Sequence, residues 1–270
     1  MDKILFDAHS HLNDEEYTET ERAAVVSAIG ESPLWGIIDV GYDLATSALA
    51  AAHSEMYPWC FATVGLLPVD GGRDYDSGGD DALAEIARLS KGPKVMAIGE
   101  IGLEYSKGCN GQGTDDADKA RQAGQFRAQL ALARELGMPV VIHDMNAHED
   151  TMRILKEERA FDVAGVMIHC YSGHVEQALE YVSLGAMISV AGQITWDGNK
   201  KLARVAAQVP MESLLIETDA PFLAPEPHRG EKNMSPYVEY TARKLAEIRG
   251  MSYEEVAAVT RTNTCRFFGI

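Results

Sequence analysis

The stretch Pro139-Val140-Val141-Ile142-His143 is a short apolar run that ends in a histidine. Runs of this length without polar alternation are typical of strands buried on both faces of a parallel sheet. Seven other runs along the chain share this character. The eight predicted strands are Ile4–Phe6, Gly36–Val40, Phe61–Gly65, Val95–Gly99, Pro139–Ile142, Gly165–Ile168, Ala186–Val190 and Leu214–Glu217.

Helical patterns separate these runs. The predicted helices are Glu19–Ile29, Leu44–Met56, Ala82–Ser90, Ala117–Leu136, Glu149–Glu158, Val175–Leu184, Asn199–Gln208 and two C-terminal helices. Gly137 and Pro139 stop the longest of them, and Ser252 with Glu255 fits a capping box in the last. Eight strands, each followed by a helix or loop, predict an α/β fold with a single (β/α)₈ TIM barrel spanning residues 1–270 as one domain. The Gly/Asp-rich stretches Asp70–Asp81 and Ser106–Asp116 are expected to be surface loops.

Composition narrows the cellular setting. No run of about 18 apolar residues is present, so no transmembrane helix is expected. The N-terminal residues lack the basic start and apolar core of a signal peptide, so we expect a cytoplasmic protein. Its four cysteines, Cys60, Cys109, Cys170 and Cys265, form no C-x-x-C pair and give no reason to expect a disulfide framework.

The formal net charge is −17. Proteins that grip long duplex nucleic acid usually carry a basic footprint that displaces counterions. The charge therefore weighs against extended duplex binding. It leaves open a brief encounter with a phosphoester, because a local basic patch or a bound dication can serve one phosphate.

Polar residues that can bind metal follow five of the predicted strands. In Asp7-Ala8-His9-Ser10-His11, residues two apart point to the same side of an extended chain, so two imidazoles aim at one point. The others are Glu100, His143, His169 and Asp219, after the fourth, fifth, sixth and eighth strands. Each alone is an ordinary polar residue at a strand end. Together they would converge on one mouth of the barrel, where four histidines and two carboxylates suit Zn²⁺, Mn²⁺ or a similar dication.

Several segments resemble the successive motifs of TatD-type metal-dependent hydrolases, a family of amidohydrolase-like barrels. The matching segments are Asp7–Leu12, Ala97–Tyr105, Gln125-Phe126 with Gln129-Leu130, His169–Gly173, Glu217–Pro225, Arg229-Gly230 with Asn233, and Asn263–Gly269. The resemblance runs from the first strand to the last helix.

The resemblance implies two divalent metal ions, whether Zn²⁺, Mg²⁺ or Mn²⁺. His9, His11 and Asp219 would hold one ion, His143 and His169 the second, and Glu100 would bridge them. Asp219 would also act as the general base on a metal-activated water, with Glu100 as the second catalytic residue. Glu217 either orients this neighbourhood or is a buried residue satisfied by the barrel.

Two residues depart from the family pattern at the mouth. The usual Gly-x-His-Pro turn reads Gly65-Leu66-Leu67-Pro68, so Leu67 replaces a histidine. Met145 stands two residues beyond His143, where the family usually places an arginine. Both missing groups could contact a phosphate, so their loss weakens the case for phosphodiester hydrolysis while leaving the metal ligands intact.

Other side chains are weaker candidates. Arg229 could bind an anionic substrate, and Tyr105 or Trp196 could stack on a base, although a surface salt bridge and ordinary packing are their alternatives. His53 is expected on the surface, and His148, His174 and His228 in caps, turns or loops.

The sequence thus predicts a metal-dependent hydrolase of ester bonds, with a TatD-like deoxyribonuclease that meets single-stranded DNA ends transiently as the leading hypothesis. A small-molecule amidohydrolase or lactonase is the alternative, favoured by Leu67, Met145 and the acidic charge. A non-catalytic metal-binding barrel is a third hypothesis, against which the six ligands argue.

Overall fold

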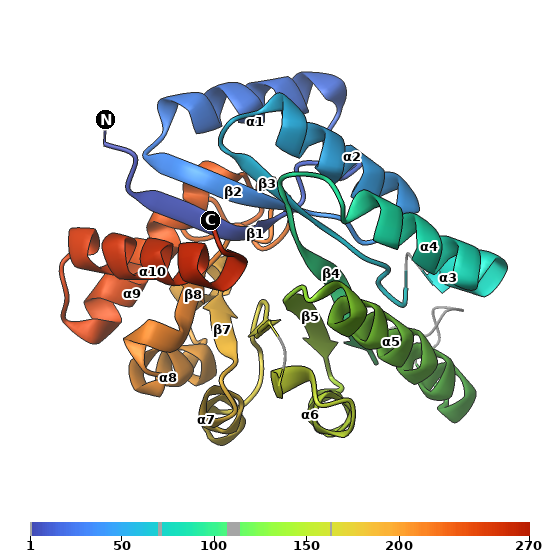
Figure 1. The fold of residues 1–270 in the computed structure, drawn as a ribbon. Helices are drawn as coiled ribbons and strands as arrows, with labels where there is room; N and C mark the ends of the chain where they lie inside the picture. The colour runs from blue at the N-terminus through green and yellow to red at the C-terminus, as the bar shows by residue number, and fades with distance from the viewer. Residues whose placement is uncertain (1, 70–71, 107–113, 163) are drawn as a thin grey trace.

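The computed structural model describes residues 2–69, 72–106, 114–162 and 164–270. Eight strands form one sheet in sequence order, with every neighbouring pair parallel. β1 also lies against β8, so the sheet is a nearly closed barrel (Figure 1), which confirms the predicted (β/α)₈ fold. The strands are β1 (Leu5–Ser10), β2 (Leu34–Val40), β3 (Cys60–Val64), β4 (Val95–Glu104), β5 (Val140–Met145), β6 (Val166–Ile168), β7 (Met187–Val190) and β8 (Leu214–Ile216).

Helices lie around the outside of the strands (Figure 1). They are α1 (Glu19–Glu31), α2 (Leu44–Met56), α3 (Gly72–Gly78), α4 (Asp80–Leu89), α5 (Asp116–Leu136), α6 (His148–Glu157), α7 (Val175–Ser183), α8 (Lys200–Gln208), α9 (Val238–Arg249) and α10 (Tyr253–Phe268). Short 3₁₀ turns are η1 (Ala160–Asp162), η2 (Gly192–Thr195), η3 (Met211–Ser213) and η4 (Ser235–Tyr237). The predicted capping box of Ser252 and Glu255 is present at the start of α10.

The apolar core has two layers. A small cluster takes residues from seven of the eight strands, which can all touch one another only inside the barrel. Its members are Phe6, Ala8, Ile38, Val40, Ala97, Val141, Met167, Met187, Leu215 and Phe268 of α10. A larger cluster lies between the strands and the helices. Both faces of the strands are therefore buried, which explains their nearly continuous apolar sequences.

Of the four register shifts in the described sheet, two give β1 and β4 one extra residue relative to the next strand. Between Asp7 and Ser10, β1 advances three residues while β2 advances two. Between Ile98 and Ile101, β4 likewise advances three residues while β5 advances two. Such an irregularity breaks the alternation of side chains and re-aims the residues at that point. These are the positions of His9 and Glu100.

Some sequence predictions were wrong in detail. Asp70–Asp81 is not a loop throughout, because α3 and the start of α4 lie within it. His53 is not on the surface: it is buried, with its Nδ1 2.7 Å from Asp39 Oδ2. β1, β4 and β5 run beyond their predicted ends, so His9, Glu100 and His143 lie within strands and not after them. Residues 107–113 of the predicted Ser106–Asp116 loop lie outside the described residues.

Within the described ranges, no helix has both the length and the apolar character needed to cross a membrane. Cys60, Cys170 and Cys265 are free thiols, and Cys109 lies outside the described residues. The cytoplasmic location stays a prediction.

Candidate metal centre

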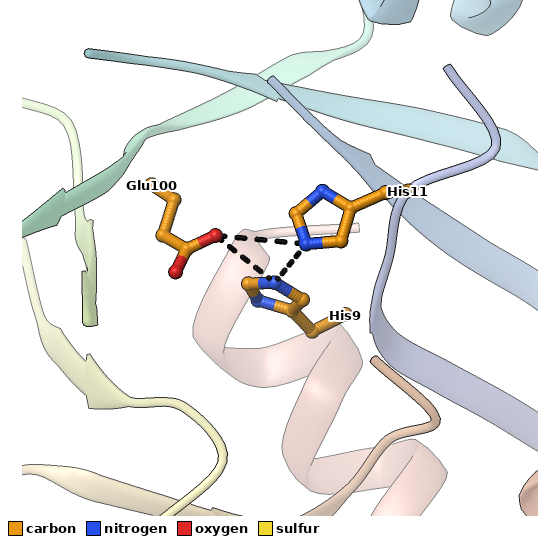
Figure 2. A group of neighbouring side chains, drawn as sticks. All are labelled: His9, His11 and Glu100. Carbon is orange, nitrogen blue, oxygen red and sulfur yellow. Dashed lines mark hydrogen bonds and ion pairs between the residues drawn. The ribbon is translucent and has the colours of Figure 1, made fainter. Parts of the chain in front are cut away.

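His9 and His11 meet at one end of the barrel. Their Nε2 atoms are 3.1 Å apart and both face one oxygen of Glu100 (Figure 2), with Glu100 Oε2 at 3.5 Å from His9 and 3.6 Å from His11. Asp219 approaches the same point, because its Oδ1 lies 3.6 Å from His9 Nε2 and 3.3 Å from His11 Nε2. We call these four side chains, with Glu100 contributing Oε2, the first half of the centre.

Five of the six separations between the ligand atoms of the first half suit a tetrahedral metal site. Zn–N and Zn–O bonds of about 2.0–2.1 Å place tetrahedral ligand atoms roughly 3.4 Å from one another. The five separations given above lie between 3.1 and 3.6 Å. His11 Nδ1 is 2.8 Å from the carbonyl oxygen of Val40, so it can donate there and leave Nε2 free to face an ion. The donor set and its spacing therefore fit a dication.

His143 and His169 form the second half of the centre with the other oxygen of Glu100. Oε1 lies 2.7 Å from His143 Nδ1 and 2.8 Å from His169 Nε2, and the two nitrogens are 3.2 Å apart. The first two separations are those of hydrogen bonds to the carboxylate. An ion here would replace those bonds and push the donors a few tenths of an ångström apart, so the second half fits a metal less closely than the first.

Local backbone features place these side chains at the mouth of the barrel. The extra residues of β1 and β4 aim His9 and Glu100 into the barrel mouth. Gly102 has φ +145°, and a Cβ there would come within 2.0 Å of the carbonyl oxygen of His143, so only glycine lets β4 pass this closely. Asp219 has φ +55°, in the left-handed region that is costly for residues other than glycine.

The Asp219 turn is held by buried polar groups on both sides. Asp7 accepts hydrogen bonds from the backbone N–H and the hydroxyl of Thr218, at 2.8 and 2.6 Å. The Asn233 amide donates to the carbonyls of Thr218 and Phe222, at 2.9 and 2.6 Å. These bonds stabilise the strained backbone that presents Asp219.

The buried charged groups of the centre shift one another's pKa values. Burial alone would lower the pKa of His11 and His143, but the hydrogen bonds and charges of Asp219, Glu100 and Glu104 raise each to about 9. The pKa of His169 is raised well above its usual range against the same burial effect, by the charge of Glu100. Burial and the positive charge of His169 lower the pKa of His9.

The carboxylates respond in the opposite sense. Burial would raise the pKa of Glu100, but the charge of His169 and its hydrogen bonds to His143 and His169 hold it well below the usual range. Burial would likewise raise the pKa of Asp219, and the hydrogen bond to His11 lowers it. Without an ion, His11, His143 and His169 thus hold protons as the cations that balance the two carboxylates, whereas His9 does not.

Two further carboxylates support the ligands. Glu104 Oε2 lies 3.2 Å from His143 Nε2, and its Oε1 accepts from the backbone N–H and hydroxyl of Ser106. Glu217 Oε1 lies 3.4 Å from His169 Nδ1 and accepts from Cys170 N at 2.7 Å. The rings of His9 and His169 stack at 3.9 Å, and both residues form a cluster with Glu217.

Sequence reasoning missed Glu104 as a partner and left Glu217 undecided. Glu104 lies four residues after Glu100 on the same strand, and that spacing was the available signal.

A cavity of about 490 Å³ opens over the centre, and we call it the metal pocket. Its walls include the two departures from the family pattern, Leu67 and Met145, together with Phe222 and Leu223. Acidic side chains other than the proposed ligands are Asp14, Glu15, Glu16 and Asp144. No lysine or arginine lines the pocket among the residues that the structure describes. Any anion bound here would depend on metal ions for its counter-charge.

The turn that carries Leu67 is fixed by α5. Gln129 Oε1 accepts from the Leu66 backbone N–H at 2.8 Å, and the amides of Gln125 and Gln129 both donate to the Leu66 carbonyl at 2.8 Å. The Leu67 N–H donates to the Tyr42 carbonyl at 2.7 Å. The backbone of this turn is thus bonded on both sides.

None of the three predicted substrate contacts lines the metal pocket. The Arg229 guanidinium lies 4.6 Å from the ring centroid of Trp196 and 3.8 Å from Glu226 Oε1. The Tyr105 hydroxyl donates to Asp150 at 2.8 Å. Their role as substrate contacts stays a prediction.

The remaining histidines lie outside the centre. His148 is the first residue of α6 and lies 2.9 Å from Asp144, and His174 is the N-cap of α7 without a side-chain cap bond. His228 stacks on Tyr237.

Comparison with known proteins gives one consistent result. The family model described as TatD related DNase matches residues 6–269. The chain is 40% identical to a metal-dependent hydrolase, YabD, of Bacillus subtilis (strain 168), covering 99% of this chain and all of that protein. It is 30% identical to a protein of Escherichia fergusonii named 3'-5' ssDNA/RNA exonuclease TatD, covering 98% of this chain and 99% of that one. The crystal structure of YJJV, a TatD homolog from Escherichia coli K12, superposes with a TM-score of 0.87 at 27% identity over the full length of both chains.

Proposed function

Since this chain belongs to the TatD-related DNase family and is a metal-dependent hydrolase, we propose that it hydrolyses phosphodiester bonds at the ends of single-stranded DNA with two divalent ions. One observation carries the proposal: the two oxygens of Glu100 face different pairs of histidine nitrogens. A carboxylate in this position can bridge two cations. A relative that is 30% identical over nearly the whole chain is named as a 3'-5' exonuclease of single-stranded DNA and RNA, which supports the substrate class.

His9, His11 and Asp219 would hold one ion, His143 and His169 the other, and Glu100 both. The mixture of imidazole nitrogen and carboxylate oxygen favours Zn²⁺ or Mn²⁺, with Mg²⁺ as a further candidate. When bound, two neighbouring dications lower the pKa of a water and polarise the phosphoryl oxygen.

The side chains of this chain would then have separate duties. Asp219 lines the metal pocket and keeps its carboxylate ionised, so it is placed to take a proton from the attacking water. Glu100 would hold the two histidine pairs in position, because each of its oxygens faces one pair. Glu104 accepts from the outer ring nitrogen of His143, and Glu217 lies 3.4 Å from that of His169, so both carboxylates help to orient the rings.

The walls of the metal pocket support a second candidate, a hydrolase of lactones or cyclic amides. Leu67 and Met145 line the pocket where the family pattern has a histidine and an arginine, and Phe222 adds a further apolar wall. A neutral ring needs no cation beyond the metal centre, whereas a phosphodiester carries a charge into an acidic pocket.

Turnover on two substrate panels separates the candidates. Purified protein, reconstituted in turn with Mg²⁺, Mn²⁺ and Zn²⁺, is given single-stranded oligonucleotides, lactones and cyclic amides. We expect shortening of the oligonucleotides from one end, with Asp219→Asn inactive as the matched control. Hydrolysis of the rings alone would assign the second function.

Elemental analysis tests whether the chain binds two divalent ions, on which both candidate functions depend. We expect about two ions per chain, one for each half of the centre. A protein that neither retains nor takes up metal would contradict both candidates.

A further inference from the structure

Two more hollows lie beside the metal pocket, one after the other. The first has a volume of about 220 Å³ and shares Gln193 with the metal pocket; its walls include Tyr171 and Trp196, and we call it the aromatic hollow. The second has a volume of about 460 Å³ and shares Lys201 with the aromatic hollow. The three hollows therefore follow one another from the metal pocket along the η2 turn to the first turn of α8.

The last of these hollows is basic. Lys200, Lys201 and Arg204 line the last hollow and are exposed, and we call these three residues the basic track. One carboxylate, Glu176, lines the same hollow. Across the described residues, no carboxylate lies within 4.0 Å of the charged nitrogens of the basic track, as an ion pair would require.

The three cations of the basic track lie within five residues of one another. Many other cations of the described residues pair with a carboxylate, as in Arg88–Glu85, Arg127–Glu158 and Arg243–Glu239, and others such as Lys94 bond to backbone carbonyls. The net charge of the chain is −17, whereas the described side chains that line this last hollow include three cations and one carboxylate. The metal pocket itself offers no lysine or arginine among its described lining residues.

The aromatic hollow has a wall suited to a polymer. The indole of Trp196 is anchored by donation from Nε1 to the Ala224 carbonyl at 2.9 Å, and Arg229 covers it at 4.6 Å. The hollow also contains the hydroxyl of Ser172 and the amide of Gln193. Aromatic surface followed by cations is the combination with which proteins hold single-stranded nucleic acid.

We propose that a single strand of nucleic acid whose end occupies the metal pocket runs past Gln193 and Trp196 and binds the basic track through its phosphates. The inference rests on the proposed phosphodiester function. A flexible single strand can follow the turn from pocket to helix, whereas a rigid duplex would bring its charge against the acidic surface around it. The track thus supplies, at a distance from the cut bond, the cations that Leu67 and Met145 leave out of the pocket.

The test measures binding without cleavage. A fluorescein-labelled oligothymidylate of about 12 nucleotides with cleavage-resistant phosphorothioate linkages is titrated with the metal-loaded full chain, and anisotropy is followed over a range of salt. The track variant is Lys201→Gln with Arg204→Gln. The matched control is Arg88→Gln with Lys91→Gln at the end of α4, which removes the same charge on the opposite side of the barrel (Figure 1).

We expect the track variant to bind about tenfold more weakly at low salt, and the slope of log affinity against log salt to fall by about 1.4, because each phosphate contact on a single strand contributes about 0.7. The control variant should bind as the original chain does. Equally weakened binding in both variants would show that only the total charge matters, and it would overturn the proposed role of the basic track. Unchanged binding in the track variant, or no binding by the original chain, would overturn it as well.

Hydrolysis assays keep this proposal separate from the function on which it rests. If binding depends on the track but no metal gives cleavage of the unmodified oligonucleotide, the phosphodiester function fails and the binding surface stands. If cleavage occurs and the track variant binds as the original chain does, the function stands and the track fails. Melting curves of both variants check that each is folded.

Discussion

Each half of the metal centre places two histidines against one oxygen of Glu100, but the two halves differ in the spacing of these donor atoms. In the first half, Glu100 Oε2 stands 3.5 and 3.6 Å from the nitrogens of His9 and His11. In the second half, Glu100 Oε1 stands 2.7 and 2.8 Å from those of His143 and His169. The wider spacing leaves room for an ion, whereas the narrower one is closed by hydrogen bonds. Without metal, the first half is therefore preorganised for an ion. In the second half, hydrogen bonds from the two histidines to Glu100 occupy the position of the ion.

The largest expected effect comes from removing the proposed base in the first half. Asp219→Asn keeps the shape of the side chain but loses its ability to accept a proton, so kcat should fall by about 10³-fold. The measurement is turnover of the best substrate at saturating metal. Asp162→Asn, on the exposed surface beside Arg159, is the matched control and should keep full turnover. Full activity in Asp219→Asn would remove Asp219 from the role of base.

The pH dependence of metal binding should separate the halves next. In the first half the pKa of His11 is raised to about 9 while that of His9 is lowered, so binding at neutral pH displaces one proton. In the second half the pKa of His143 is raised to about 9 and that of His169 well above its usual range, so two protons must leave. Protons compete with metal below these pKa values. Affinity should therefore rise with pH up to about 9, about tenfold per unit for the first ion and up to a hundredfold per unit for the second.

Calorimetry in two buffers of different ionisation enthalpy counts the protons released with each ion. Equal release from both halves would contradict the difference between them. A second ion that binds more tightly than the first at pH 7 would do so as well.

A smaller effect is expected from Glu104→Gln. Glu104 faces His143 and no ligand of the first half, so only the second ion should be weakened, by about tenfold. Stepwise metal titration of the variant measures this. Glu85→Gln on the surface of α4 is its matched control. Equal weakening of both ions would show that the halves are coupled through Glu104.

The smallest effect concerns the wall of the second half. Met145 lies on β5 two residues after His143 and lines the metal pocket. Met145→Arg should raise kcat/KM for a phosphodiester by roughly fivefold, because a partly exposed cation contributes about 1 kcal/mol toward an anion. Met145→Leu should leave it unchanged. A lower value in Met145→Arg, with faster lactone hydrolysis by the original chain, would favour the second candidate function.

Much of the architecture could be predicted from the apolar runs. Strands buried on both faces have no alternation, so β5 and β6 are evident from Val140–Ile142 and Val166–Ile168. The ends of the strands were harder to predict. The ladder between β4 and β5 continues through His143 and resumes at Ile101 after Glu100, because the hydrogen bonds between strands do not depend on the polarity of a side chain.

Tertiary contacts explain the other misses. The Gly72–Gly78 segment has poor helical propensity, but Asp74 accepts from the Leu44 N–H at 2.9 Å and ties α3 to the start of α2. His53 has a helical context that predicts an exposed position, yet its partner Asp39 lies on β2 and draws it inward. The extra residues in β1 and β4 had no sequence signal, since Ala8 and Gly99 are ordinary strand neighbours of an apolar run.

The bonds from Gln125 and Gln129 to Leu66 have a consequence for protein engineering. Because both glutamine amides grip backbone atoms, the path of the turn does not depend on which side chain stands at position 67. That position can then be randomised, in a library of variants selected on anionic or neutral esters, with little risk of disturbing the scaffold. Substrate preference in this barrel should therefore be adjustable by changing the side chain at position 67 alone, because the backbone of the turn is already fixed.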